Sequence, residues 1–407
     1  MHSTASDRSF MERALRLATR GRGYVEPNPM VGAVIVKDGQ VAAEGFHARF
    51  GGPHAEVVAL REAASRGVAT RGATLYLTLE PCAHHGKTPP CAPAVAEAGF
   101  QRVVIATADP LWARHASRAG SGGGTRGLAI LRAAGVATEV GMCREEAVVL
   151  NAAFFKRARA GLPLVIAKWA MSADGKIATR TGASRWISCA ESRRLVHELR
   201  GRVDAIIVGI RTVQRDDPLL TCREAEARRA AARVVLCGSR APDPDSQLVR
   251  TARLVPVILA FPETRPPEGV HELKEQGCEL LPLPAADRPD AVDLRRLLAA
   301  LAEREASNVL VEGGCEVLGS FFDDALVDRA LVFVAPFLIG GSEAVTAVGG
   351  KGVEEIKNAL PFVGQRFVWV QDPPGLPGLE TTVRPVGRDL LIEGWISTPL
   401  QWAPEAE

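Results

Sequence analysis

Apolar and polar positions along the first third of the chain follow two different periods, and these periods predict alternating helices and strands. Asp7 can cap a first helix that places Met11, Leu15 and Ala18 on one face. Two apolar runs follow, separated by the residues Lys-Asp-Gly-Gln at 37–40. An Asp-Gly pair between such runs predicts a β-hairpin.

The next stretches continue the alternation. A helical pattern opens at His54, and strand-like runs cover 73–79, 102–108 and 137–142. Helices fit at 93–99 and 128–135, and another helix is expected to begin near Cys82. Helices and strands in this order predict a three-layer α/β domain over residues 1–150.

A stretch rich in Gly, Ser, Ala and Arg interrupts this domain at 109–127. Gly122, Gly124 and Gly127 have the spacing of a dinucleotide-binding fingerprint. That fingerprint requires a strand directly before it, and the nearest predicted strand ends well upstream. The stretch is therefore interpreted as a mobile loop.

A second α/β domain is predicted after a helical stretch at 145–159 and a break at Gly161 and Pro163. This second domain is expected to span residues 161–407. Within it, residues 221–233 are expected to form a solvent-exposed excursion. Buried strands are predicted at six places: 164–170, 204–209, 233–237, 253–260, 308–314 and 329–335.

Composition narrows the function classes. The 407 residues suggest two or three domains, and 47% hydrophobic and 24% charged residues are ordinary for a globular protein. A net charge of +2 and few aromatic residues argue against nucleic-acid binding. No secretory signal or membrane-spanning run is visible, which predicts a cytoplasmic protein whose eight cysteines are not disulfide-bonded.

The segment LEPCAHHGKTPPC at 79–91 carries two cysteines among three prolines. With His54 it offers one imidazole and two thiolates, a ligand set that leaves the fourth position of a zinc ion open for water. Zinc lowers the pKa of that water to about 7. Glu56, in the first helical turn after His54, can shuttle a proton from this water to a leaving amine. His-Ala-Glu followed by Pro-Cys and a second Cys is typical of zinc-dependent base deaminases.

The motifs HAE and PCAHHGKTPPC, preceded by PNPMVGAVIVKDG, resemble the bifunctional deaminase–reductases of riboflavin biosynthesis over nearly the whole chain. The resemblance implies a cytidine-deaminase-like domain that deaminates 2,5-diamino-6-(5-phosphoribosylamino)pyrimidin-4-one. It also implies a dihydrofolate-reductase-like domain that uses NADPH to reduce the ribosyl chain of the product to ribityl. The implied deaminase residues are the zinc ligands His54, Cys82 and Cys91, the catalytic Glu56, and the substrate residues Asn28, His47, His84, Lys87 and Asp109.

For the second domain, the resemblance concerns polar residues at strand ends, where doubly wound sheets bind their ligands. The strand 308–312 runs into Gly313-Gly314 and a helix, whose N-terminus suits a phosphate. The implied NADPH residues are Ala170, Trp186, Thr212, Asp216 and Gly314. The implied substrate residues are Lys168, Ser172, Asp174, Ser184, Leu220, Arg223 and Glu312, with Arg223 on the ribose phosphate and Lys168 or Asp174 as candidate acid.

Two alternatives remain open at this point. Leu111 stands where the family usually has Asn, and this departure allows a chain whose deaminase half is inactive and whose zinc is structural. A polynucleotide-editing deaminase is the other alternative, although charge and aromatic content disfavour it. The family resemblance also predicts a homo-oligomer, and it leaves the choice between NADPH and NADH undecided.

Overall fold

The structure is a computed structural model that describes residues 4–111, 126–371, 376 and 378–404. Internal contacts divide these residues into two units, with the division between Ala160 and Gly161. The first unit also contains Leu376, Gly378 and the C-terminal residues from Pro399. Among the described helices, none combines the length and the apolar character that crossing a membrane requires.

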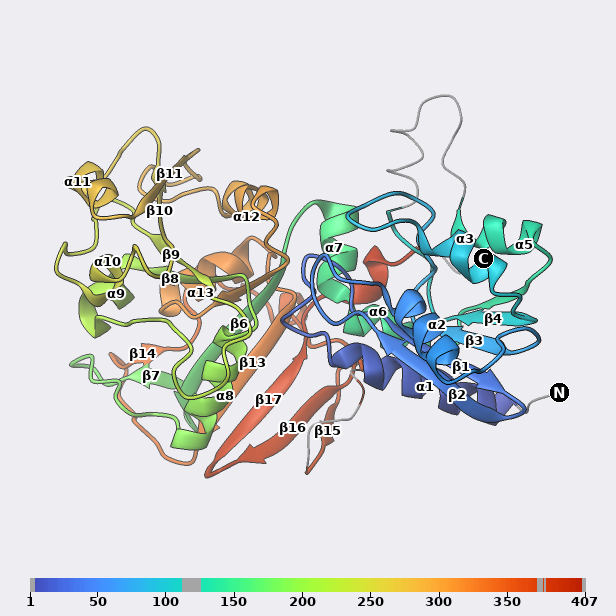
Figure 1. Cartoon of the computed structure of the whole chain (residues 1–407). Coiled ribbons are helices and arrows are strands. Elements are labelled where there is room, and N and C mark those ends of the chain that lie inside the picture. The colour runs from blue at the N-terminus through green and yellow to red at the C-terminus, as the bar shows by residue number, and fades with distance from the viewer. Residues whose placement is uncertain (1–3, 112–125, 372–375, 377, 405–407) are drawn as a thin grey trace. The chain divides into compact units, whose positions relative to one another are not determined.

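The first unit contains a five-stranded sheet of order β2-β1-β3-β4-β5 (Figure 1). β1 pairs antiparallel with β2 and β3, whereas β3, β4 and β5 are parallel. Its elements are α1 (Thr4–Thr19), β1 (Gly32–Lys37), β2 (Gln40–Phe46), α2 (Ala55–Ser65), β3 (Thr74–Leu77), α3 (Cys91–Glu97), β4 (Arg102–Ile105), α5 (Gly127–Ala133), β5 (Ala137–Val140), α6 (Arg144–Leu150), α7 (Ala152–Ala160) and the 3-10 helix η2 (Pro399–Trp402).

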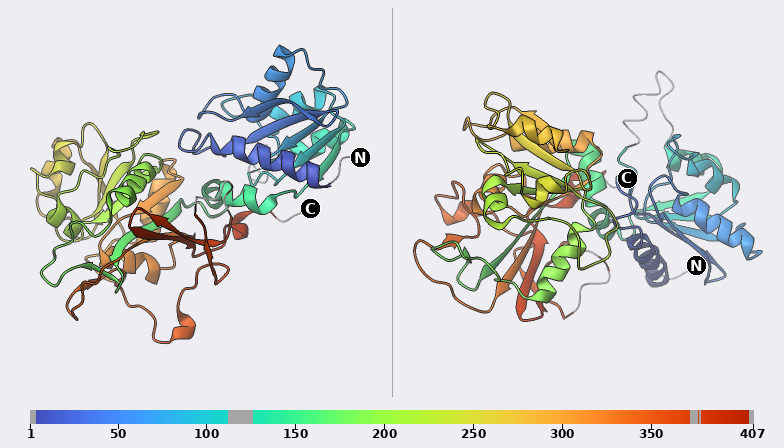
Figure 2. Two further views of the ribbon diagram at one scale, coloured as in Figure 1. Left: turned by 90° about the horizontal axis from the view of Figure 1, so that it is seen from below. Right: turned by 60° about the vertical axis from the view of Figure 1, so that its left-hand side comes forward.

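Helices cover both faces of this sheet, which gives three layers (Figure 2). Met11 and Leu15 of α1 and Ala147 of α6 share a core with the side chains of β1, β3 and β4 that point to one face. On the opposite face α2 lies so close to β2 that a Cβ on Gly45 would come within 2.3 Å of the Ala55 carbonyl oxygen. Gly45 therefore lets the first turn of α2 approach the sheet.

The second unit contains a ten-stranded sheet of order β11-β10-β9-β8-β12-β6-β13-β17-β16-β15. The strands from β11 to β13 are parallel, and β17 and β16 add an antiparallel edge. Its elements are β6 (Leu164–Ser172), β7 (Lys176–Ala178), α8 (Ala190–Arg200), β8 (Ala205–Gly209), α9 (Ile210–Asp216), β9 (Ala232–Leu236), α10 (Gln247–Arg250), β10 (Val257–Pro262), α11 (Val270–Glu275), β11 (Glu279–Leu283), α12 (Leu294–Glu303), β12 (Asn308–Val311), α13 (Cys315–Asp323), β13 (Arg329–Ala335), β14 (Val345–Thr346), η1 (Ile356–Asn358), β15 (Phe367–Trp369), β16 (Thr381–Val386) and β17 (Asp389–Trp395).

Alternate residues of the central strands serve opposite faces of this sheet. Val165 and Val311 point towards α12 and α13 and belong to the main core. Ala170 and Phe333 point the other way and pack with Val196 of α8. Lys168 and Glu312 have the same parity as this second set, so they lie on the face that α8 covers.

The sequence predictions for the elements are largely confirmed. The hairpin turns at Asp38 and Gly39, both with positive φ, and all six strands predicted for the second domain are present. The predicted helix at 145–159 is interrupted at Asn151. Sequence reasoning did not find the strands β7, β11, β14, β15, β16 and β17.

Three local expectations were wrong. Asp7 does not cap the first helix, because α1 begins at Thr4 and Asp7 lies within it. No helix begins at Cys82, because residues 81–90 form an irregular loop and α3 begins at Cys91. The three prolines of this loop remove backbone donors that a helix would need. The excursion predicted at 221–233 ends earlier than expected, since Arg233 is fully buried within β9. Its guanidinium donates hydrogen bonds to Thr251 Oγ1 and to the carbonyl oxygens of Leu219 and Thr251.

The C-terminal segment completes the first unit. η2 contacts α6 and α7, and Trp402 is buried with Lys156 Nζ 5.4 Å from its ring centroid. Arg144 donates a hydrogen bond of 2.6 Å to the carbonyl oxygen of Pro404. Both the start and the end of the described chain thus belong to one unit.

Candidate functional site

Three predicted ligand side chains converge beside the first turn of α2. His54 is the N-cap residue of α2, Cys91 is the first residue of α3, and Cys82 lies in the loop before α3. Their ligand atoms all lie within 4.8 Å of one another. His54 Nδ1 is 3.5 Å from Cys82 Sγ and 3.3 Å from Cys91 Sγ. The structure therefore brings together the whole predicted metal set.

The two thiols cannot both be ionised easily at this distance. The neighbouring Cys91 thiol and His54 lower the pKa of the Cys82 thiol to about 4, and the backbone N–H of Cys91 donates to Cys82 Sγ at 3.3 Å. The hydrogen bond with Cys82 in turn raises the pKa of the Cys91 thiol. A divalent cation would allow both sulfurs to be thiolates. One imidazole and two thiolates are ligands that suit zinc, so this donor set fits that ion.

Glu56 lies in the same helical turn and is 4% exposed. Its Oε2 atom has no hydrogen-bond partner among the residues that the structure describes. Burial raises the pKa of this carboxyl to about 7, and the charge of Cys82 acts in the same direction. A buried carboxyl oxygen without a partner next to a metal set is available to a water molecule or a substrate.

His47 lies beside His54, and Asn28 contacts His47. The rings of His47 and His54 are 5.3 Å apart, edge to face. His47 Nδ1 is 3.0 Å from the carbonyl oxygen of Pro53, and Nε2 is 3.3 Å from Asn28 Nδ2. Burial lowers the pKa of His47, so its ring is neutral near pH 7. These two predicted substrate residues are thus brought to the metal set.

The remaining predicted residues of this half lie in the loop before α3 and in the loop after β4. His84 is half-buried in the loop after Cys82, and Lys87 is exposed with Nζ 3.9 Å from the ring centroid of Phe50. Asp109 is buried at the end of β4 and accepts a hydrogen bond from the Leu111 N–H. Burial raises its pKa to about 6. Residues 112–125, including Gly122 and Gly124 of the predicted loop, lie outside the described residues.

Glu80 is a residue that sequence reasoning missed here. It is buried and accepts hydrogen bonds from the backbone N–H groups of Asp109 and Leu128, and it pairs with Arg126 at 3.2 Å. It thereby fixes the start of α5 and the position of Asp109. Gly127, which begins α5, lies against the Pro81 carbonyl, since a Cβ there would be 2.0 Å away.

A second cluster lies in the second unit, where β12 ends beside the middle of β6. Val311 pairs with Ala167, which places the next residues, Glu312 and Lys168, side by side. Lys168 Nζ is 3.8 Å from Glu312 Oε2. Arg200 of α8 grips both carboxylate oxygens of Glu312, at 2.6 and 2.9 Å.

Burial and neighbouring charges shift the pKa values of both Glu312 and Lys168. Burial works against the Glu312 carboxylate, but Arg200 and Lys168 outweigh it and lower the pKa of Glu312 to about 2. Burial lowers the pKa of Lys168, Glu312 opposes this shift and Arg200 adds to it. The Lys168 ammonium therefore gives up its proton more readily than that of an ordinary lysine.

Ser172 and Asp174 belong to a different network. Ser172 Oγ donates to Asp174 Oδ1 at 2.5 Å, and the N–H groups of Ile339 and Gly340 donate to the same carboxylate. The hydroxyl and these backbone donors lower the pKa of the exposed Asp174 to about 2. Of the two candidate acids, Asp174 is thus ionised at neutral pH, which leaves Lys168 as the candidate proton donor.

Two of the predicted cofactor residues, Gly314 and Thr212, lie at the N-terminus of α13. Gly314 is its N-cap, and a Cβ at this position would lie 3.4 Å from Thr212 Oγ1 of α9. Ala170 follows Lys168 on the same face of β6. Trp186 is 65% exposed, with the Arg193 guanidinium 4.5 Å from its ring centroid. The carbonyl oxygen of Asp216 accepts a hydrogen bond from the Arg185 guanidinium. Ser184, the residue before Arg185, is half-buried.

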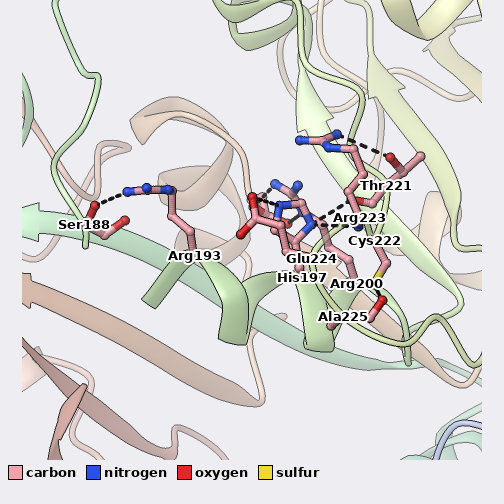
Figure 3. A network of polar contacts seen from close by, with 10 residues as sticks. Ser188, Arg193, His197, Arg200, Thr221, Cys222, Arg223, Glu224 and Ala225 are labelled. Carbon is pink, nitrogen blue, oxygen red and sulfur yellow. Dashed lines mark hydrogen bonds and ion pairs between the residues drawn. The ribbon is translucent and has the colours of Figure 1, made fainter. Parts of the chain in front are cut away.

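The last two predicted substrate residues lie in the loop after α9. Leu220 is buried with a positive φ of 53°, and Arg223 is exposed. This loop contacts His197 of α8, which sequence reasoning did not single out (Figure 3). Arg200 was missed as well. Their spacing of three residues places both on one helix face, but their partners are distant in sequence.

Comparisons with known proteins match two different families to the two units of the chain. Residues 4–107 match the family described as "Cytidine and deoxycytidylate deaminase zinc-binding region", and residues 163–365 match the "RibD C-terminal domain". The "Riboflavin biosynthesis protein RibD" of Aquifex aeolicus is 39% identical over 349 residues, which are 86% of this chain and 92% of that protein. The protein of the same name from Escherichia coli is 38% identical over 88% of this chain and 94% of that protein.

Solved structures give the same answer. The Thermotoga maritima "diaminohydroxyphosphoribosylaminopyrimidine deaminase/ 5-amino-6-(5-phosphoribosylamino)uracil reductase" is 33% identical with a TM-score of 0.76, covering 96% of this chain and 99% of that one. "Acinetobacter baumannii RibD, form 1" is 31% identical with a TM-score of 0.76 and the same coverage.

Proposed function

The chain belongs to the RibD family of bifunctional riboflavin biosynthesis proteins, with a zinc-binding deaminase domain and a reductase domain, and we propose from this premise which residues perform each reaction. The substrates we propose are the two that its Thermotoga maritima relative is named for. The assignment of deamination to residues 1–150 and of reduction to 161–407 is part of the same proposal.

In the deaminase half, His54, Cys82 and Cys91 would hold zinc, which when bound makes water a usable nucleophile near neutral pH. Glu56 accepts the proton of that water and delivers it to the departing ammonia. The observation that carries this role is the buried, unpartnered Oε2 atom of Glu56 beside the three ligand atoms. Asn28, His47, His84, Lys87 and Asp109 surround the pyrimidine ribotide.

In the reductase half, we infer that NADPH is the hydride donor. Gly314 leaves a space beside Thr212 that a side chain would narrow, and the N–H groups at the start of α13 suit a phosphate. Trp186, stacked on Arg193, offers an aromatic surface, and Ala170 and Asp216 complete the set. The cofactor carries the hydride chemistry, and these residues orient it.

Lys168 is the proton donor of this proposal. Reduction of the opened ribose adds hydride to the carbonyl carbon and a proton to its oxygen. Lys168 is half-buried and burial lowers its pKa, whereas Asp174 is ionised. Glu312 keeps Lys168 in place, and Arg223 binds the ribose phosphate. Ser172, Ser184 and Leu220 border the substrate.

A mass-spectrometric product assay tests both halves. We expect deaminated product from the diaminopyrimidine ribotide without NADPH, and ribityl product when NADPH is added. If pre-deaminated substrate is reduced but nothing is deaminated, the first half has lost its activity and its zinc is structural. NADH in place of NADPH checks the cofactor choice. The cytoplasmic location, the homo-oligomeric state and the absence of nucleic-acid and membrane partners stay predictions.

A further inference from the structure

The loop that carries Arg223 is attached to α8 through the ring of His197. His197 Nδ1 is 3.0 Å from the carbonyl oxygen of Thr221 and 3.3 Å from the backbone N of Arg223. One ring nitrogen thus meets an acceptor and a donor of the same short turn, and either neutral tautomer satisfies one of them. Figure 3 shows His197 at the centre of this network.

The flanks of this loop are held by other groups. Buried Arg233 donates to the carbonyl oxygen of Leu219, and the carbonyl oxygen of Gly201 accepts from the N–H groups of Arg228 and Arg229. Gly201 lets the loop approach, because a Cβ there would lie 3.2 Å from Cys222 Sγ. His197 therefore fixes the part of the loop between two independently anchored ends.

The ring works through hydrogen bonds and not through charge. His197 is 6% exposed, and burial lowers its pKa, with Arg200 and Arg223 acting in the same direction. Glu224 Oε1 lies 3.7 Å from Nε2 and opposes this shift only in part. A neutral imidazole at pH 7 can position a backbone turn without competing with Arg223 for an anion.

We propose that His197 is a positioning residue of the reductase, which fixes the turn from Thr221 to Glu224 on α8 and so holds Arg223 where the substrate phosphate binds. This inference rests on the proposed role of Arg223 in phosphate binding. Arg223 is exposed, and its Nη1 donates a hydrogen bond of 3.4 Å to Thr221 Oγ1 within the same turn. Its reach is therefore set by the backbone that His197 holds.

The test uses steady-state reduction by full-length variants. His197→Leu fills the ring's space without polar atoms, and we expect it to raise the KM for the phosphorylated substrate about 10-fold or more with little change in kcat, as expected when a charge-assisted contact is lost. His197→Asn places an amide where Nδ1 lies and should restore most of the KM. Glu198→Gln, on the neighbouring position of the same helix, is the matched control and should leave the KM unchanged.

A substrate without its phosphate separates positioning from general damage. With this substrate, His197→Leu should have the same KM for reduction as the unmodified chain. The deaminase activity of His197→Leu should also equal that of the unmodified chain. Hydrogen exchange of the peptide containing Thr221 and Arg223 should be faster in His197→Leu and normal in His197→Asn. An equal KM increase for both substrates, or failure of Asn to rescue, would overturn the inference.

Arg223→Met tells this failure apart from failure of the proposed function. If Arg223→Met raises the KM and His197→Leu does not, the positioning role is wrong and the phosphate contact stands. If neither variant changes the KM, Arg223 does not bind the phosphate, and both proposals fall. In the Arg223→Met background, His197→Leu should add little, because both changes remove the same contact.

Discussion

His54 Nε2 lies 3.2 Å from Thr88 Oγ1, so the ring nitrogen that faces Cys82 and Cys91 is Nδ1. A histidine that ligates a metal through Nδ1 carries its proton on Nε2, and Thr88 is placed to accept that proton in a hydrogen bond. Partners of this kind orient the ligand and raise its basicity.

Replacing Thr88 by Val should therefore weaken zinc binding about 10- to 100-fold, as the loss of such partners typically does. Thr88→Ser keeps the hydroxyl and should bind zinc normally. Competition with a coloured chelator measures both affinities. Equal affinities for the two variants would mean that the contact does not hold the imidazole.

Glu56→Gln should keep zinc and abolish deamination, by about 10²- to 10⁴-fold or more, because the amide cannot accept the proton of the attacking water. Zinc content and product formation are measured on the same sample. Reduction of pre-deaminated substrate serves as the internal control for folding. Turnover close to that of the unmodified chain would sink the assigned role.

Lys168→Met should stop reduction by about 10²- to 10⁴-fold while deamination continues. Asp174→Asn should lower the rate of reduction far less than Lys168→Met. The Asp174 carboxylate holds the backbone of Ile339 and Gly340 and carries no transferable proton at neutral pH. Loss of NADPH absorbance follows both variants. The reverse ranking would transfer the acid role to Asp174.

The pH profile of reduction gives a separate check on Lys168. Burial lowers the pKa of this amine, and only its protonated form can donate, so kcat should fall as the pH rises through a value below 10.5. Glu312→Gln removes the carboxylate that favours the charged amine. The decline should then begin at lower pH, and an unmoved profile would contradict the coupling.

Gly45→Ala should lower zinc content and deaminase activity together. The added methyl would collide with the Ala55 carbonyl oxygen at 2.3 Å and with Ala59 N at 2.5 Å, both backbone atoms of α2. The helix must shift, and it carries His54 and Glu56 at its start. Normal zinc content at full activity would show that the sheet yields instead. Reduction provides the control, because Gly45 lies in the deaminase unit.

The sequence was sufficient for the elements and residues whose signal is local. The hairpin at Asp38-Gly39, the helix that opens at His54 and the three metal ligands all follow from short patterns, and the structure brings these ligands together. The helix predicted at 93–99 is found as α3, whereas the helix expected near Cys82 is absent, because the proline context there was taken for a helix start.

Partners that are distant in the chain could not be predicted. Arg200 grips Glu312, and His197 holds the Thr221 turn, only because β12 and the loop after α9 pack against α8. Glu80 likewise reads as an ordinary acidic residue until the fold brings Asp109 and Leu128 to it. Such contacts depend on sheet order, which local periodicity does not encode.

The docking of η2 onto α6 and α7 has a consequence for synthesis on the ribosome. Domains generally fold as they emerge, from the N-terminus first. Here the deaminase unit emerges early, yet Trp402 and Pro404, which cover Lys156 and Arg144, are translated only after the reductase unit. The nascent deaminase must therefore wait, with that surface uncovered, until the whole reductase has been made.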